Sequence, residues 1–339
     1  MTNLGVLQEG RVRRSARQAQ LRRRRRRRRL GLGLGLAVLA LGVVTLLLFM
    51  AARASGPARE PRRLVGAPSR VVAHRRIALN RYGAVLSGVL VHPRFKTALR
   101  SGLLFDVHTG RILWERDPER LLPIASLTKM MTALVVVAHA RPSARVLITR
   151  QALSFSGSGV GLLPLGRRVS AETLLYGLLL PSGNDAAIAL AQHVGGSQGR
   201  FVAMMNSRAQ AMGLGCTHFS TVSGIRDRDN RSCATDLARI AHAVLTQPLL
   251  SRIVATRDAA LPFPIKGGKL YLYNNNPLLR LSFPGTDGVK TGYTAAAGQC
   301  LVVAVRRGHR WLGAVLLNSV DPPGQAEALL NLGFATPGP

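Results

Sequence analysis

Residues 299–318 read QCLVVAVRRGHRWLGAVLLN, and they carry the strongest structural signal in the chain. Two apolar runs, Gln299–Val305 and Trp311–Asn318, are rich in Val and Leu and are separated by the charged turn Arg306–Arg310. Apolar runs of this length on either side of a short polar turn are typical of buried strands. We therefore predict that the two runs are adjacent strands of a central sheet.

A second strand pair is predicted much earlier in the chain. Gly102–Val107 and Arg111–Glu115 flank the turn His108-Thr109-Gly110, in which glycine supplies the turn conformation. Apolar residues at helical spacing predict helices at Ser126–Ala140, Glu172–Leu180, Asp185–His193, Phe201–Met212 and Ala326–Phe334. Strands at both ends with helices between them predict an α+β domain whose sheet is completed by the C-terminal strands.

The first 76 residues differ from this pattern. Arg22–Arg29 is an unbroken run of eight arginines, and Leu30–Ala52 follows with 23 uncharged residues. A helix of that length spans roughly 35 Å and could cross a bilayer, with the positive end in the cytoplasm. We predict a basic cytoplasmic tail (1–29), a single transmembrane helix as anchor (30–52), a basic linker (53–76) and an extracytoplasmic globular domain (77–339).

Two alternatives apply to this N-terminal region. Ala52-Arg53-Ala54 resembles a small-residue cleavage site, so a signal peptide cleaved near Ala54 and a secreted product form the main alternative. The arginine run could also indicate nucleic-acid binding or nuclear import. Because the apolar span follows the arginine run directly, we expect membrane attachment and no nucleic-acid partner.

Composition excludes several classes of protein. A hydrophobic content of 47% excludes a disordered chain, and three cysteines exclude a disulfide-rich scaffold. Eight histidines occur without an HExxH pattern, so we expect no metal and no cofactor. Cys216 and Cys233 flank Thr217–Ser232, and in an oxidising compartment we predict that they pair and leave Cys300 outside the disulfide.

The segment Ser126-Leu127-Thr128-Lys129 lies at the predicted start of a helix. Its i, i+3 spacing puts the serine hydroxyl and the lysine amine on one helix face. A serine needs a base to become a nucleophile, and apolar surroundings lower the pKa of a lysine, which makes it such a base. Alone, this pattern is weak, and the alternative is that Ser126 is an ordinary helix N-cap.

Two further segments carry candidate site residues. Ser182-Gly183-Asn184 follows Pro181 in a predicted loop, where the hydroxyl could relay a proton and the amide could hold a substrate; the alternative is a helix cap. Lys290-Thr291-Gly292 suits capture of a carboxylate, with glycine permitting close backbone approach; the alternative is an edge strand with a solvated lysine. Val289 excludes a Walker A loop because glycine should occupy that position.

The three segments occur in the order SxxK, SxN and KTG, the signature of penicillin-recognising serine enzymes. The surrounding sequence resembles the serine D-alanyl-D-alanine carboxypeptidases among the low-molecular-weight penicillin-binding proteins over about residues 101–335. The stretches that carry the resemblance are PIASLTKMMTALVV, LLYGLLLPSGNDAAIALAQHVGGS, FVAMMNSRAQAMGL and GVKTGYTAAAGQCLVVA. The resemblance implies a penicillin-binding/β-lactamase-like transpeptidase domain with a central antiparallel sheet flanked by helices.

The resemblance also implies a catalytic role for four residues. Ser126 would be the acylated nucleophile, and Lys129 would be the base that activates it. Ser182 would pass a proton to the leaving D-alanine, and Asn184 would orient the donor peptide.

Four residues of the third segment would bind the substrate. Lys290 and Thr291 would hold the terminal carboxylate, and Gly292 would lie beside the extended peptide. The backbone N–H groups of Ser126 and Tyr293 would form the oxyanion hole.

The implied function is that of an extracytoplasmic DD-carboxypeptidase acting on peptidoglycan stem peptides that end in D-Ala-D-Ala, with β-lactam antibiotics as inhibitors. A DD-endopeptidase that cuts cross-links would use the same residues, and a non-catalytic cell-wall-binding protein is an alternative of a different class. A β-lactamase is disfavoured because no ExxxN loop is evident between Ser126 and Lys290. Many family members continue into an all-β domain, which we do not expect after residue 339. Residues 77–98 have no counterpart that we can assign.

Overall fold

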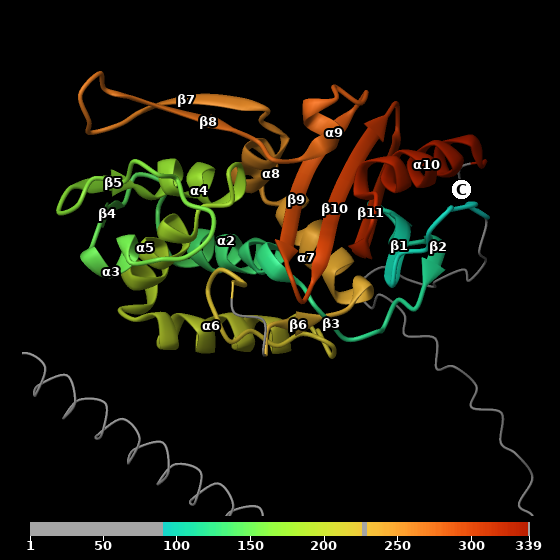
Figure 1. The fold of residues 1–339 in the computed structure, drawn as a ribbon, viewed down its shortest axis with the longest axis horizontal. Coiled ribbons are helices and arrows are strands. Elements are labelled where there is room, and N and C mark those ends of the chain that lie inside the picture. The colour runs from blue at the N-terminus through green and yellow to red at the C-terminus, as the bar shows by residue number, and fades with distance from the viewer. Residues whose placement is uncertain (1–90, 226–228, 338–339) are drawn as a thin grey trace, which may run out of the picture. The chain divides into compact units, whose positions relative to one another are not determined.

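The computed structural model describes residues 91–225 and 229–337. Its main element is a five-stranded antiparallel sheet with strand order β2-β1-β11-β10-β9 (Figure 1). The strands are β1 (Ser101–Asp106), β2 (Ile112–Arg116), β9 (Thr286–Thr294), β10 (Gly298–Arg307) and β11 (Arg310–Ser319). The two apolar runs between residues 299 and 318 are the adjacent strands β10 and β11, which confirms that prediction.

The sheet joins the two ends of the described region. β1 pairs with β11 in a register that sets Ser101 opposite Leu317 and Asp106 opposite Leu312. β1 and β2 form the predicted hairpin, and the N–H of Gly110 closes its turn on Asp106 O (2.9 Å). The C-terminal strands therefore complete the sheet, as the sequence pattern predicts.

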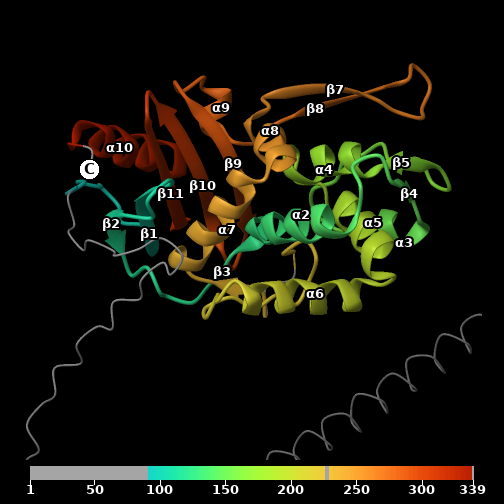
Figure 2. The ribbon, with the colours of Figure 1, turned by 180° about the vertical axis from the view of Figure 1, so that it is seen from behind.

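Each face of the sheet is covered by helices. Successive residues of a strand point to opposite faces, so Val302 and Val303 of β10 enter two separate hydrophobic clusters. Val303 packs in the cluster that contains α10 (Pro322–Ala335), whereas Val302 packs in the larger cluster that contains α7 (Ala234–Thr246). Figure 2 shows α7 in front of the sheet when the molecule is seen from behind. This two-sided burial explains why β10 is almost continuously apolar.

The remaining helices lie on the α7 side and build a helical region next to the sheet (Figures 1 and 2). They are α2 (Thr128–His139), α3 (Arg150–Leu153), α4 (Ala171–Leu179), α5 (Asn184–Gly195), α6 (Gln198–Ala211) and α8 (Pro248–Ala255), with the short α9 (Pro277–Arg280) at the edge of the sheet. Three short strand pairs complete the fold: β3 (Leu122–Pro123) with β6 (Arg231–Ser232), β4 (Arg145–Leu147) with β5 (Arg168–Ser170), and β7 (Asp258–Pro262) with β8 (Lys269–Tyr273). The five predicted helices are present, whereas α7, α8 and the β7–β8 hairpin were not predicted.

The start of α2 differs from the prediction of a helix from Ser126. Residues Ala125–Leu127 form a separate 3-10 turn, and the α-helix begins at Thr128. Ala125 is buried with a φ of 46°, a left-handed conformation that an L-residue adopts at a cost, and the hydroxyl of Thr128 donates to its carbonyl (2.8 Å). Ser126 is therefore held in a tight turn ahead of the helix and is not its N-cap.

The predicted tail, transmembrane anchor and linker lie outside the described residues. Within residues 91–225 and 229–337, no helix combines the length and the apolar character that crossing a bilayer requires.

Candidate active site

The two polar residues of the SxxK segment meet in the structure. Ser126 lies in the 3-10 turn, and Lys129 lies in the first turn of α2. The distance between Lys129 Nζ and Ser126 Oγ is 2.8 Å, which is hydrogen-bond distance. A nucleophile and a base within this distance are the geometric requirement for activating a serine hydroxyl.

Lys129 is surrounded by protein. Its side chain is 0% exposed, and Nζ also donates to the backbone carbonyl of Ser223 (2.8 Å). Burial lowers the pKa of Lys129 well below its usual value, the charge of Lys290 lowers this pKa further, and the carboxylate of Asp185 raises it. A lysine whose pKa is lowered in this way loses its proton more readily than a solvated lysine, and the neutral amine can accept a proton.

The SxN segment lies between α4 and α5 and leaves two polar atoms without partners. Ser182 is buried with a φ of 69°, and its Oγ has no hydrogen-bond partner among the described residues. Asn184 begins α5, and its Nδ2 donates to Ser156 O (2.6 Å), whereas its buried Oδ1 is likewise unpaired within the described part. Because buried polar groups in native proteins are usually paired, these two atoms mark a position where a ligand could supply the partner.

Asp185 organises the loop that faces this segment. Its buried carboxylate accepts hydrogen bonds from the backbone N–H groups of Val160 (2.9 Å) and Ala186 (2.8 Å). The same carboxylate raises the pKa of Lys129, so the start of α5 lies within electrostatic range of that amine. Asp185 thus connects loop 156–161, α5 and the SxxK segment.

The KTG segment lies on β9, the edge strand of the sheet, next to the 3-10 turn. Lys290 is 1% exposed, its Nζ donates to Thr291 O (3.0 Å), and burial lowers its pKa to about 7. A Cβ at position 292 would lie 3.1 Å from Ile124 O and 3.2 Å from Ser126 N, so β9 approaches the turn closely at this glycine. The following residue, Tyr293, is 69% exposed. Lys290 is therefore a buried amine at the site, not the solvated lysine of the alternative.

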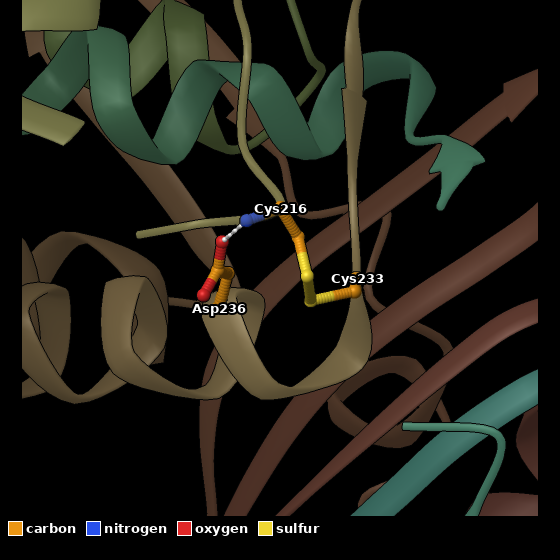
Figure 3. A group of neighbouring side chains, drawn as sticks. All are labelled: Cys216, Cys233 and Asp236. Carbon is orange, nitrogen blue, oxygen red and sulfur yellow. Dashed lines mark hydrogen bonds between the residues drawn. A yellow bond between two sulfur atoms is a disulfide. The ribbon is translucent and has the colours of Figure 1, made fainter. Parts of the chain in front are cut away.

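A loop held by a disulfide forms another wall of the site. Cys216 and Cys233 are joined, with a Cα–Cα distance of 5.6 Å, which confirms the predicted pairing (Figure 3). Asp236 of α7 accepts from the backbone N–H of Cys216 (2.8 Å), as Figure 3 also shows. The segment between the cysteines provides Ser223 O to Lys129, so the disulfide and Asp236 fix the ends of a loop that contacts the base.

A family profile described as D-alanyl-D-alanine carboxypeptidase, peptidase S11, matches residues 90–321. The chain belongs to this family. The match includes all three segments described above.

Individual relatives agree with this assignment to the carboxypeptidase family. The D-alanyl-D-alanine carboxypeptidase DacF of Bacillus subtilis is 31% identical over 70% of this chain, and the chain spans 62% of its length. The D-alanyl-D-alanine endopeptidase of Pseudomonas aeruginosa is 33% identical over 65% of this chain and 71% of its own length. The crystal structure of the Streptomyces K15 DD-transpeptidase superposes with a TM-score of 0.67 at 32% identity, covering 72% of this chain and all of that one.

Within this member of the carboxypeptidase family, sequence reasoning missed three functional candidates. Ser223 contributes a backbone carbonyl, which no side-chain motif reveals. Asp185 directly follows the SxN segment, and this position next to a motif could have marked it as a functional candidate. Asp236 holds Cys216 and Thr217 from a helix that was not predicted.

Proposed function

We propose that this chain is a serine DD-carboxypeptidase that removes the terminal D-alanine from peptidoglycan stem peptides through an acyl-enzyme on Ser126. One observation carries the proposal: a buried lysine amine lies 2.8 Å from a serine hydroxyl, in surroundings that favour the neutral amine. That pair is suited to acyl transfer and requires no metal ligand.

In the proposed acylation, neutral Lys129 accepts the proton of the Ser126 hydroxyl while Oγ attacks the penultimate carbonyl carbon. The backbone N–H groups of Ser126 and Tyr293 stabilise the oxyanion of the tetrahedral intermediate. The peptide C–N bond then breaks, and Ser182 passes the proton to the departing amine of D-alanine. Water hydrolyses the resulting ester and regenerates Ser126.

Substrate recognition in this proposal uses charge and strand geometry. Lys290 and Thr291 bind the terminal carboxylate, because a nearby negative charge favours the protonated form of the buried Lys290 amine. Asn184 binds a backbone amide of the donor peptide through the Oδ1 atom that has no partner among the described residues. Gly292 lets the peptide lie along the free edge of β9 as an added strand.

The decisive experiment is labelling with a fluorescent penicillin together with an assay of D-alanine release from a pentapeptide. We expect the wild-type chain to be labelled and to release D-alanine, and Ser126→Ala to do neither while keeping its unfolding temperature. Absence of labelling in folded wild-type protein would contradict the proposal and would favour a non-catalytic cell-wall-binding protein.

A second candidate activity has its own support, because the relative from Pseudomonas aeruginosa is named an endopeptidase. Both activities would use Ser126, Lys129 and Lys290, and they differ in the group that leaves. Product analysis with a pentapeptide and a cross-linked dimer separates them. We expect faster turnover of the pentapeptide, and preferential cleavage of the dimer would establish the endopeptidase.

We also propose that the chain is a single-pass membrane protein with a cytoplasmic N-terminus and an extracytoplasmic catalytic domain. The arginine run before residues 30–52 supports this topology, and a disulfide between Cys216 and Cys233 is typical of a domain outside the cytoplasm. A phosphatase reporter fused after Pro339 should be active in intact cells. Reporter activity only in the cytoplasm would contradict this topology, and release of a shortened product into the medium would indicate cleavage near Ala54.

A further inference from the structure

The β7–β8 hairpin has one face toward the protein and one face toward solvent. Side chains alternate along β8: Leu270 and Leu272 are buried, whereas Lys269, Tyr271 and Tyr273 are exposed. Figures 1 and 2 show the hairpin extending above α4. The buried leucines account for the attachment of the hairpin to the domain, and the exposed tyrosines are not needed for it.

The tyrosines of this outer face are open. Tyr271 is 61% exposed and Tyr273 is 67% exposed. Their partners across the hairpin are Ala260 and Asp258, which are too small to cover an aromatic ring. Residues i and i+2 of a strand lie roughly 7 Å apart, so the two rings form a short row on one surface. Neighbouring exposed aromatic side chains of this kind are typical of binding surfaces.

The end of β8 is joined to the chain just before the SxN segment by two hydrogen bonds. Asn275, two residues after Tyr273, donates its backbone N–H to Leu180 O (3.1 Å) and its side-chain amide to Pro181 O (3.1 Å). Pro181 immediately precedes Ser182. Along β8, Tyr273 is therefore nearer to the SxN segment than Tyr271.

We propose that the outer face of β8, formed by Lys269, Tyr271 and Tyr273, binds the glycan strand to which a stem peptide is attached. This inference rests on the proposed function and names the part of the substrate that lies outside the catalytic residues. The ring face of a tyrosine is the negative side of its quadrupole and attracts the C–H groups that a hexosamine ring presents on its flat faces. The tyrosine hydroxyls stay in contact with water, as binding of a hydrated polysaccharide requires.

The choice of a glycan as the ligand rests on the ring faces of the tyrosines and on the hydrogen bonds that join Asn275 to the SxN segment, and not on charge. Segment 257–273 carries Arg257, Lys266 and Lys269 against Asp258, so binding to an anionic membrane is one of the outcomes that the test must separate. Asp258 lies directly opposite Tyr273, and its carboxylate is 3.8 Å from Arg257 Nε. Lys269 at the other end of the row can pair with a carboxylate of a neighbouring stem peptide.

The test compares two substrates and one binding probe in the full-length protein. In the double variant Tyr271→Ala/Tyr273→Ala, we expect kcat/KM for D-alanine release from a glycan-linked pentapeptide to fall roughly tenfold, which corresponds to loss of one or two good contacts. Release from the free pentapeptide and the rate of penicillin acylation should not change. Binding of an N-acetylglucosamine oligosaccharide, followed by calorimetry, should be lost.

Two control variants separate stacking from unspecific effects. Tyr271→Phe/Tyr273→Phe keeps both ring faces and should retain preference for the glycan-linked substrate. Val320→Ala removes an exposed apolar side chain elsewhere and should behave as wild type, because Val320 is 61% exposed and lies outside the hairpin.

The outcomes distinguish this inference from the proposed function. Equal loss on both substrates, or no loss on either, would overturn the inference while leaving the proposed function intact. Oligosaccharide binding that is retained in Tyr271→Ala/Tyr273→Ala would also overturn the inference. If that variant instead loses binding to vesicles that contain phosphatidylglycerol and keeps the wild-type preference for the glycan-linked pentapeptide, the inference is overturned and the tyrosines are identified as a membrane contact. Wild-type protein that resists penicillin but binds the oligosaccharide through these tyrosines would overturn the proposed function alone.

Discussion

Lysine is scarce in this chain, and two of its few lysines are buried at the candidate active site. Five of the 47 basic residues are lysine. Lys129 and Lys290 are 0% and 1% exposed, although a long charged side chain is rarely buried so completely. Arginine stays protonated in proteins and has a larger, planar head group, so it cannot replace a lysine that must lose its proton. The proposed role of Lys129 requires loss of a proton, whereas the proposed role of Lys290 requires a positive charge. Substitution of each lysine by arginine therefore distinguishes the two roles.

Lys129→Arg should reduce the acylation rate constant with a labelled penicillin by ~10²–10⁴-fold, the usual contribution of a general base. An arginine at this position cannot accept the proton of Ser126, so its effect should approach that of Ser126→Ala. The measurement is the acylation rate of variants whose circular dichroism matches wild type. Near-normal acylation of folded Lys129→Arg would show that Lys129 is not the base.

Lys290→Arg should change the pH dependence of acylation and keep measurable activity. In the wild type, the rate should rise with pH as Lys129 loses its proton, and it should fall as Lys290 loses its charge above its pKa of about 7. Arginine keeps its charge, so the variant should lose the alkaline decline and keep the acidic rise. Its affinity for the substrate carboxylate should fall because the geometry of the head group differs. An alkaline decline that persists unchanged in the variant would assign it to another group.

At the scale of elements, loops that are tied to α5 and α7 form much of the site. Asp185 at the start of α5 holds loop 156–161, and the disulfide before α7 fixes the loop that carries Ser223. Backbone groups of both loops face residues of the SxxK and SxN segments. The precision of the site therefore depends on tethers that take no part in the proposed bond changes.

Asp185→Asn should shift the acidic limb of the acylation profile to lower pH. Removing the carboxylate charge removes an interaction that raises the pKa of Lys129, so that lysine becomes neutral at lower pH. Asparagine retains one oxygen that can accept from the N–H of Val160, whereas Asp185→Ala loses it and should cost ~1–3 kcal/mol in free energy of unfolding. An unchanged profile in folded Asp185→Asn would show that this charge does not act on Lys129.

Removal of the disulfide should lower stability and slow acylation together. In Cys216→Ser/Cys233→Ser, the free energy of unfolding should fall by about 3 kcal/mol, the value expected for closing a loop of this size. Acylation should slow because the carbonyl of Ser223 is held less firmly against Lys129. A reducing agent should have the same effects on the wild type and none on the double variant. Full activity of the double variant at temperatures where it is folded would show that Asp236 and the backbone hold this loop without the disulfide.

The sequence predicted those elements whose signal is local. Two apolar runs and a charged turn are sufficient to predict β10 and β11. The SxxK, SxN and KTG segments are short patterns of side chains that can be recognised in the sequence. The β7–β8 hairpin was missed because half of its residues face solvent and its turn is longer than a two-residue hairpin. The 3-10 turn at Ser126 was missed because it packs closely against Gly224 and Gly292, which lie far along the chain and are not part of any local pattern. Contacts made by the backbone, such as the hydrogen bond from Lys129 to Ser223 O, cannot be predicted from a pattern of side chains.

For the whole molecule, the order of the strands in the sheet differs from their order in the chain. β1 is an early element of the described region, yet its neighbour β11 is the last strand. Pairings between such distant segments must overcome a large loop-closure entropy, and they slow folding. During synthesis on the ribosome, β1 can pair with β2 at once, but its other edge has no partner until β11 has been made, which exposes that edge to wrong partners. The KTG segment is also synthesised late, so Lys290 can pack near Ser126 only at this stage. A nascent chain that lacks its last fifty residues therefore contains Ser126 and Lys129 but not Lys290, and its site is incomplete.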